Sequence, residues 1–173
     1  NVNDSQFTVR GHDGGQGDTN LFAGQGGDAY INLESINGYS TMISGTEIQV
    51  EGGQGGNAYA SGIRSGMGGD ADIFIKGKTV DIKSCELYAK GGNGGSHSAQ
   101  SQGNDGGTTE IVLTSQNDMT LLATLLDAKD GIDTTLNPVD SSRAILESKN
   151  GKVLWDHNKP EDKKKDILST VNS

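Results

Sequence analysis

The sequence predicts an all-β fold, a parallel β-helix in which successive coils of the chain lie on one another. Three observations predict it: apolar residues that alternate with polar ones, a repeat of 39 residues, and glycine-rich segments that end each repeat. A repeat that is too short to bury an apolar face alone buries it against its neighbours in a stack. The 173-residue chain is long enough for about three to four such coils around one core.

The first strand of each repeat is expected in the segments "DAYINLES", "DADIFIKG" and "TTEIVLTS", which begin at residues 28, 70 and 108. Isoleucine stands at the same place in each segment, at Ile31, Ile73 and Ile111, with spacings of 42 and 38 residues. Apolar residues at every second position are typical of a strand with one buried face.

The second and third strands are expected within residues 40–50, 79–89 and 118–128. Apolar residues recur there 39 positions apart, as Ile43, Ile82 and Leu121, as Ile48, Leu87 and Leu126, and as Val50, Ala89 and Ala128. Because this spacing is constant and only the glycine-rich segments vary in length, the strands are expected to stack in register.

Glycine-rich segments such as "GGQGG" from Gly52 and "GGNGG" from Gly91 follow the third strands. Glycine loses more conformational freedom on folding than any other residue, so such a segment must be held by something regular. Stacked segments can pair as extended chains of the polyproline II type, because glycine lets two backbones approach closely. We expect a second packed layer; the alternative is a set of mobile loops.

These strands and "GGxGG" segments resemble the right-handed, pectin-lyase-like β-helix superfamily, and within it glycine-rich surface proteins. The resemblance covers about Phe7 to Trp155 and implies a right-handed solenoid whose outward strand face binds polysaccharide. The pectate lyases of that superfamily carry a Trp-x-Asp-His run and an Arg-x-Pro-x-x-Arg run. This chain has Trp155-Asp156-His157 without the intervening residue and has no Arg-x-Pro run, which does not favour a lyase.

The β-helix domain is expected to span residues 1–156, and residues 157–173 to form a C-terminal tail that is a helical cap or a linker. Within the domain, "RAILESKNGKVLWD" indicates an incomplete last coil with a hairpin-like turn at Asn150–Gly151. Pro160 followed by acidic residues, and then by Ile167 and Leu168, is typical of a helix start in the tail. The start at Asn1 is typical of a processed chain or a piece of a longer one.

Charge and composition exclude some partners. The net charge of −9 argues against nucleic acid, whose phosphates need a basic surface. The sequence also has no apolar run near the roughly 20 residues that a membrane span requires. Cys85 is the single cysteine, so the sequence predicts no disulfide within the chain.

The outward side chains of the third strands are the candidate ligand-binding residues. If Ile48, Leu87 and their equivalents face inward, the alternate residues face outward. The candidates among them are Glu47, Glu86, Tyr88, Lys90 and Asp127. Tyr88 would stack on a sugar ring among charged groups; the alternative is a solvated charged wall.

The sequence predicts no cofactor. Asp13, Asp18 or Asp105 would offer carboxylates to a Ca²⁺ site, but the calcium-roll repeat is approached only once, at "GGQGDTNLF". Asp28 and Asp70 each follow two glycines, where a carboxylate usually bonds backbone N–H groups at a corner.

The leading functional hypothesis is a non-catalytic, secreted or cell-surface module: an adhesin, spike or scaffold segment that binds polysaccharide or a cell-surface glycan. One alternative is a polysaccharide lyase or hydrolase, or an inactive relative of one. The other is a purely structural rod segment, joined to other domains of a longer chain. We also expect Phe74 and Val112 to form an outward apolar patch covered by the C-terminal segment; the alternative covers are the segment Leu136–Pro138 and another chain.

Overall fold

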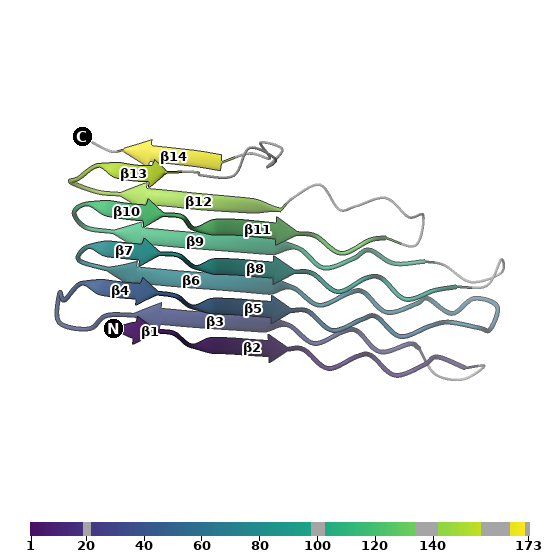
Figure 1. The fold of residues 1–173 in the computed structure, drawn as a ribbon. Helices are drawn as coiled ribbons and strands as arrows, with labels where there is room; N and C mark the ends of the chain where they lie inside the picture. The colour runs from purple at the N-terminus through teal and green to yellow at the C-terminus, as the bar shows by residue number, and fades with distance from the viewer. Residues whose placement is uncertain (19–21, 98–102, 134–141, 157–166, 172–173) are drawn as a thin grey trace.

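The computed structural model describes residues 1–18, 22–97, 103–133, 142–156 and 167–171. These residues form a parallel β-solenoid of about three turns, with no helix among them (Figure 1). The strands in chain order are β1 (Val2–Asn3), β2 (Gln6–Arg10), β3 (Ala29–Glu34), β4 (Thr41–Ser44), β5 (Glu47–Glu51), β6 (Ala71–Gly77), β7 (Val80–Lys83), β8 (Glu86–Lys90), β9 (Thr109–Ser115), β10 (Met119–Leu122), β11 (Leu125–Lys129), β12 (Arg143–Ser148), β13 (Val153–Asp156) and β14 (Ile167–Val171).

The strands form three parallel sheets, one for each strand of the repeat. The first-strand sheet has the order β14-β12-β9-β6-β3, the second-strand sheet β1-β4-β7-β10-β13, and the third-strand sheet β11-β8-β5-β2. In each coil the second and third strands run end to end, and the first strand runs in the opposite direction (Figure 1). The core lies between the first strand and the other two.

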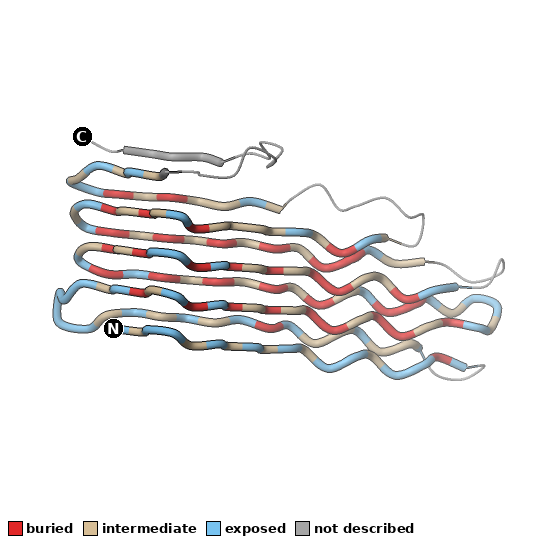
Figure 2. Tube along the Cα trace, in the orientation of Figure 1, coloured by how far each residue is buried: buried red, intermediate tan, exposed pale blue. Residues whose placement is uncertain are grey.

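The predicted register is confirmed residue by residue. Ile43 pairs with Ile82 and Ile82 with Leu121, while Leu87 lies between Ile48 and Leu126. These columns are buried in the middle coils, whereas Leu126 is only partly buried because β11 is the last strand of its sheet (Figure 2). Constant spacing within the strands therefore translates directly into stacked side chains.

The corner between the second and third strands repeats in the four coils in which both strands are described, which the sequence reasoning did not predict. One residue there has a positive φ, and the next side chain donates a hydrogen bond to the carbonyl oxygen two residues before it. The positive-φ residues are Asp4, Gly45, Ser84 and Ala123, and the donors are Ser5, Thr46, Cys85 and Thr124. Cys85 is buried at this corner, and burial raises the pKa of its thiol.

The first three glycine-rich segments each run out from a third strand and return to the next first strand. The outgoing legs (residues 11–17, 52–58, 91–97 and 130–133) bond from coil to coil at every third residue. Gly52 N donates to Lys90 O at 2.9 Å, and Gly55 N to Asn93 O at 2.9 Å. A repeat of three residues is that of a polyproline II helix.

The returning legs (residues 24–28, 65–70 and 104–108) close this arrangement into a layer. Gly53 N donates to Gly27 O at 2.9 Å, and Gly69 N donates to Gly53 O at 2.9 Å, so outgoing and returning legs bond to each other. A Cβ placed on Gly53 would lie 2.0 Å from the carbonyl oxygen of His12, closer than any side chain permits. The glycines therefore form the packed layer that their pattern predicts.

The C-terminal coil differs from the expectation in two ways. β12 and β13 belong to different sheets, so Asn150–Gly151 lies at a corner between sheets and not in a hairpin turn. Residues 167–171 form β14, paired in parallel with β12, so the predicted helix is wrong for these residues. The exposed edge of β12 offers unpaired backbone groups, and a segment rich in β-branched residues satisfies them as a strand. Residues 157–166 lie outside the described part of the chain.

The position of β14 also corrects the expected cover of the apolar patch. Phe74 and Val112 stack in register on the outward side of the first-strand sheet, with Asn32 below and Ile145 above. β14 continues this sheet beside β12 and does not lie across it. The prediction that the C-terminal segment covers the patch is therefore wrong for residues 167–171, and Leu136–Pro138 lies outside the described residues.

Candidate ligand-binding face

The outward face of the third-strand sheet brings the five candidate residues together. Between them the alternate residues Ile48, Val50, Leu87 and Ala89 are fully buried, which turns the candidates outward. The register forms three rows across the coils: Glu47, Glu86 and Leu125; Gln49, Tyr88 and Asp127; and Glu51, Lys90 and Lys129. An acidic row, a row centred on an aromatic ring and a mainly basic row thus lie side by side.

Tyr88 occupies the middle of this face. Its ring is half-buried, and Lys129 Nζ lies 5.4 Å from the ring centroid, within range of a cation–π contact. Lys129 Nζ also lies 2.6 Å from Asp127 Oδ2. Burial raises the pKa of the Tyr88 phenol, although the charge of Lys129 opposes this shift. The hydroxyl is therefore a neutral hydrogen-bond donor at physiological pH.

The acidic row lies along the edge of the face nearer the second-strand sheet. Glu47 pairs in register with Glu86, so two like charges are neighbours. Glu47 Oε2 accepts a hydrogen bond from Gln6 Nε2 at 2.9 Å. In the third row Glu51 lies opposite Lys90 in register, and its Oε1 accepts a hydrogen bond from Gln49 Nε2 at 3.1 Å.

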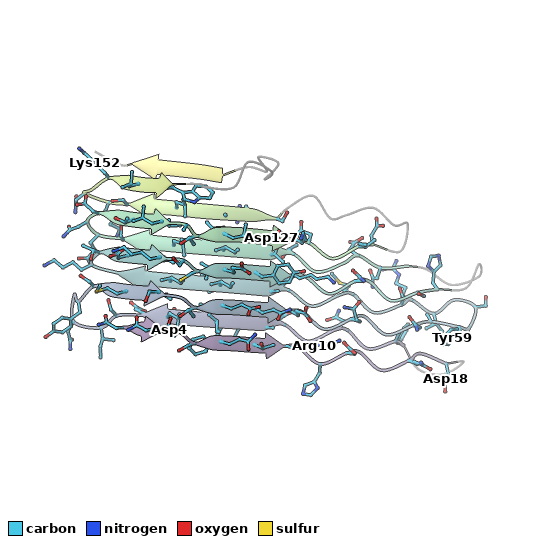
Figure 3. All side chains as sticks on the ribbon, in the orientation of Figure 1. Asp4, Arg10, Asp18, Tyr59, Asp127 and Lys152 are labelled. Carbon is cyan, nitrogen blue, oxygen red and sulfur yellow. The ribbon has the colours of Figure 1, made fainter. Side chains whose placement is uncertain are left out.

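A groove of about 440 Å³ lies on the outgoing legs, beyond the ends of the third strands, and the sequence reasoning missed it. Figure 3 shows Arg10 where an outgoing leg begins and Tyr59 where one ends. The polar residues that line the groove are Asp13, Gln16, Gln54, Asn57, Asn93 and Ser96, with glycines between them. The "GGx" period of the sequence could have indicated it. Two glycines of every three residues pack inside the layer, so the third residue, such as Gln54 or Asn93, faces outward.

The aspartates at the loop-to-strand corners have the predicted structural role. Asp28 Oδ1 accepts a hydrogen bond from Asp70 N at 3.0 Å, and Asp70 Oδ1 accepts one from Thr108 N at 2.7 Å.

Among the residues that the structure describes, no three His, Cys, Asp or Glu side chains gather closely enough to hold a metal ion. Of the calcium candidates, Asp13 accepts a hydrogen bond from Gln54 N at 2.9 Å and lies 3.5 Å from Arg10.

Trp155, which begins the lyase-like run, is partly buried and packs against the core in β13. Its ring therefore contributes to the structure of the last coil. His157 lies outside the described residues.

Asp72 lies on the first-strand sheet, away from the candidate face, in an acidic neighbourhood. Burial raises its pKa above the ordinary value of 3.8, and the negative charges of Glu110, Asp70 and Asp28 add to this shift. The hydrogen bond from Glu110 N to Asp72 Oδ1, at 3.0 Å, opposes it. Between the ordinary and the raised pKa the native state binds more protons than the unfolded chain, so stability falls as pH rises through this window.

We therefore expect Asp72→Asn to stabilise the protein at neutral pH by roughly 0.2–1 kcal/mol, because it removes a like-charge neighbour of Glu110 and keeps an oxygen that accepts from Glu110 N. The gain should shrink as pH falls below the ordinary pKa of about 3.8. Urea unfolding of both proteins at neutral and acidic pH measures this difference. Asp118→Asn is the control, because exposed Asp118 accepts a hydrogen bond from Lys152 N. Equal gains at both pH values would contradict the electrostatic argument.

No described segment forms a helix long and apolar enough to cross a membrane. Comparison of this chain with family models, with curated proteins and with solved structures finds no match.

Proposed function

We propose that this chain is a non-catalytic β-solenoid module of a secreted or cell-surface protein, and that it binds glycan chains through the outward face of the third-strand sheet. The observation that carries the proposal is the position of Tyr88, whose ring lies between a row of carboxylates and a row with two lysines. Ligand sites combine an apolar or aromatic surface with a few fixed polar groups. A sugar offers matching C–H faces and hydroxyl groups.

The rigidity of the sheet supports this role. Neighbouring strands hold the outward side chains at steps of about 4.8 Å, and the buried residues between them anchor each strand. A ligand that binds such a face does not have to order it first, so less binding free energy is lost to conformational entropy. An extended glycan that runs across the coils would meet one side chain of each row at every coil.

The carboxylate geometry supports binding without catalysis. Glycosidases use two carboxyl groups on either side of the bond that breaks, one of them with a raised pKa. Asp72, a carboxylate whose pKa burial raises, lies on the first-strand sheet, away from the candidate face, and accepts a hydrogen bond from Glu110 N. On the candidate face, Glu47 already accepts a hydrogen bond from Gln6.

Tyr88→Ala tests the proposal. We expect the parent protein to bind at least one oligosaccharide in a panel of polygalacturonate fragments and neutral hexasaccharides measured by calorimetry. Loss of the aromatic contact should weaken that binding by about tenfold, which corresponds to roughly 1.4 kcal/mol. Tyr30→Ala is the matched control, because Tyr30 is 67% exposed on the first-strand sheet.

Two results would contradict the proposal. Absence of binding to the whole panel would favour the purely structural rod. Turnover of polygalacturonate that Glu86→Gln abolishes would show that the face is catalytic.

A further inference from the structure

We infer that the groove on the outgoing legs is a second subsite, which holds an uncharged oligosaccharide along the solenoid axis. The inference rests on the proposed glycan binding and adds to it where a glycan binds and that this glycan is uncharged. Its basis is the shape of the groove, the hydrogen-bonding state of its side chains and its small charge.

Two columns of polar side chains form the walls of the groove. Asp13, Gln54 and Asn93 form one column, and Gln16, Asn57 and Ser96 form the other. The two columns are one turn of a polyproline II helix apart along each leg, which is about 9 Å. Coils follow one another at about 4.8 Å, so each column repeats at roughly the length of one hexopyranose unit.

Glycine backbone forms the floor between these walls and is held firmly in place. A Cβ on Gly55 would lie 2.0 Å from the carbonyl oxygen of Gly66, and one on Gly95 would lie 2.0 Å from that of Gly56. These glycines therefore pack closely against backbone of neighbouring legs, which fixes the floor of the groove. A site that is fixed before binding saves the cost of ordering it.

The amide side chains of the walls are oriented by the backbone of the next coil. Gln54 Oε1 accepts a hydrogen bond from Asn93 N at 3.1 Å, and Asn93 Oδ1 accepts one from Ile132 N at 3.0 Å. The amide oxygens are thus engaged, and the NH₂ groups of Gln54 and Asn93 are left to donate to a ligand. Asn57 Oδ1 likewise accepts a hydrogen bond from Ser96 N at 2.8 Å, but the NH₂ group of Asn57 donates to the Tyr59 hydroxyl at 3.1 Å, so the donors toward a ligand are those of Gln54 and Asn93.

The charge of the groove selects an uncharged ligand. Among the described residues that line it, Asp13 alone is ionisable, and its Oδ1 atom already accepts from Gln54 N and lies 3.5 Å from Arg10 NH2. An acidic sugar would find no cation in the lining, and a cation would find no cluster of carboxylates. The hydroxyl groups of a neutral sugar can accept hydrogen bonds from the amide NH₂ groups of the groove and donate to its side-chain and backbone oxygens.

Gln54→Glu tests the inference with little change in shape. A carboxylate oxygen can still accept from Asn93 N, but the NH₂ donor is gone. We expect the affinity for the neutral hexasaccharide that the parent protein binds best, among cello-, manno-, malto- and xylohexaose, to fall about tenfold. Gln25→Glu adds the same charge to an exposed returning leg and should change the affinity less than about twofold.

Gln16→Ala is a second variant that leaves the backbone hydrogen bonds intact, since Gln16 is exposed at the groove wall. It should also weaken binding of the neutral hexasaccharide, at an unchanged melting temperature.

If Tyr88→Ala abolishes binding while Gln54→Glu and Gln16→Ala leave it unchanged, the groove inference is wrong and the proposed function stands. Equal effects of Gln54→Glu and Gln25→Glu would also overturn the inference. Binding of polygalacturonate fragments alone would overturn the inference, and absence of binding to the whole panel would overturn both proposals.

Discussion

Replacing Leu87 with alanine is expected to lower the free energy of unfolding by about 2–5 kcal/mol. Leu87 is fully buried in β8 and lies in register between Ile48 and Leu126. Truncation removes the transfer free energy of the side chain and leaves a cavity, because backbone hydrogen bonds on both sides keep the neighbouring strands in place. Denaturant unfolding followed by circular dichroism measures the change.

Leu154→Ala is the matched control for this experiment. It makes the same chemical change at a side chain that is 57% exposed in β13, where less than about 0.5 kcal/mol is expected. A loss at Leu87 no larger than the loss at Leu154 would contradict the stacked core.

Gly53→Ala is expected to lower the free energy of unfolding by at least the roughly 1–3 kcal/mol that an extra methyl group costs in a well-packed core. The new Cβ would lie 2.0 Å from the carbonyl oxygen of His12 and 2.9 Å from the backbone nitrogen of Gly27. Both contacts are with backbone atoms of a neighbouring coil, so no side-chain rotation relieves them. The legs must separate and lose hydrogen bonds between them. Thermal unfolding of the variant measures this loss.

Gly15→Ala tests whether the effect comes from packing or from glycine content. A Cβ at Gly15 has no atom within 4 Å, so this variant should retain the parent stability. In the parent protein the amides of Gly53 and Gly92, which donate to Gly27 and Gly69, should exchange slowly with solvent. Equal melting temperatures for both variants, or rapid exchange at these amides, would instead favour mobile loops.

The strand register of this protein could be predicted from its sequence because the determinant is local and periodic. Alternation assigns Ile82 and Leu87 to the interior, and the constant 39-residue spacing places Ile43 and Leu121 on either side of Ile82. The same alternation turns Tyr88 and Lys90 outward, and the structure places both on one face.

The helix predicted for the tail is wrong for residues 167–171, because its local signals compete with a distant partner. Pro160 and the following acidic residues favour a helix start, yet residues 167–171 pair with β12. The free edge of β12 exists only after the coils have stacked, and its unpaired backbone groups outweigh a weak helical preference.

The repeat spacing and the alternation of apolar residues were sufficient to predict the parallel coils, the buried columns and the outward face of the third strands. The "GGx" period turns Gln54, Asn57 and Asn93 outward, but only the tertiary structure shows that they line one groove, because the groove depends on how the legs of neighbouring coils bond to each other. Spacing along a chain specifies which residues can stack. Backbone hydrogen bonds between separate coils decide which of these side chains lie together on an open surface. Every residue carries such backbone groups, so the sequence does not indicate which of them will pair.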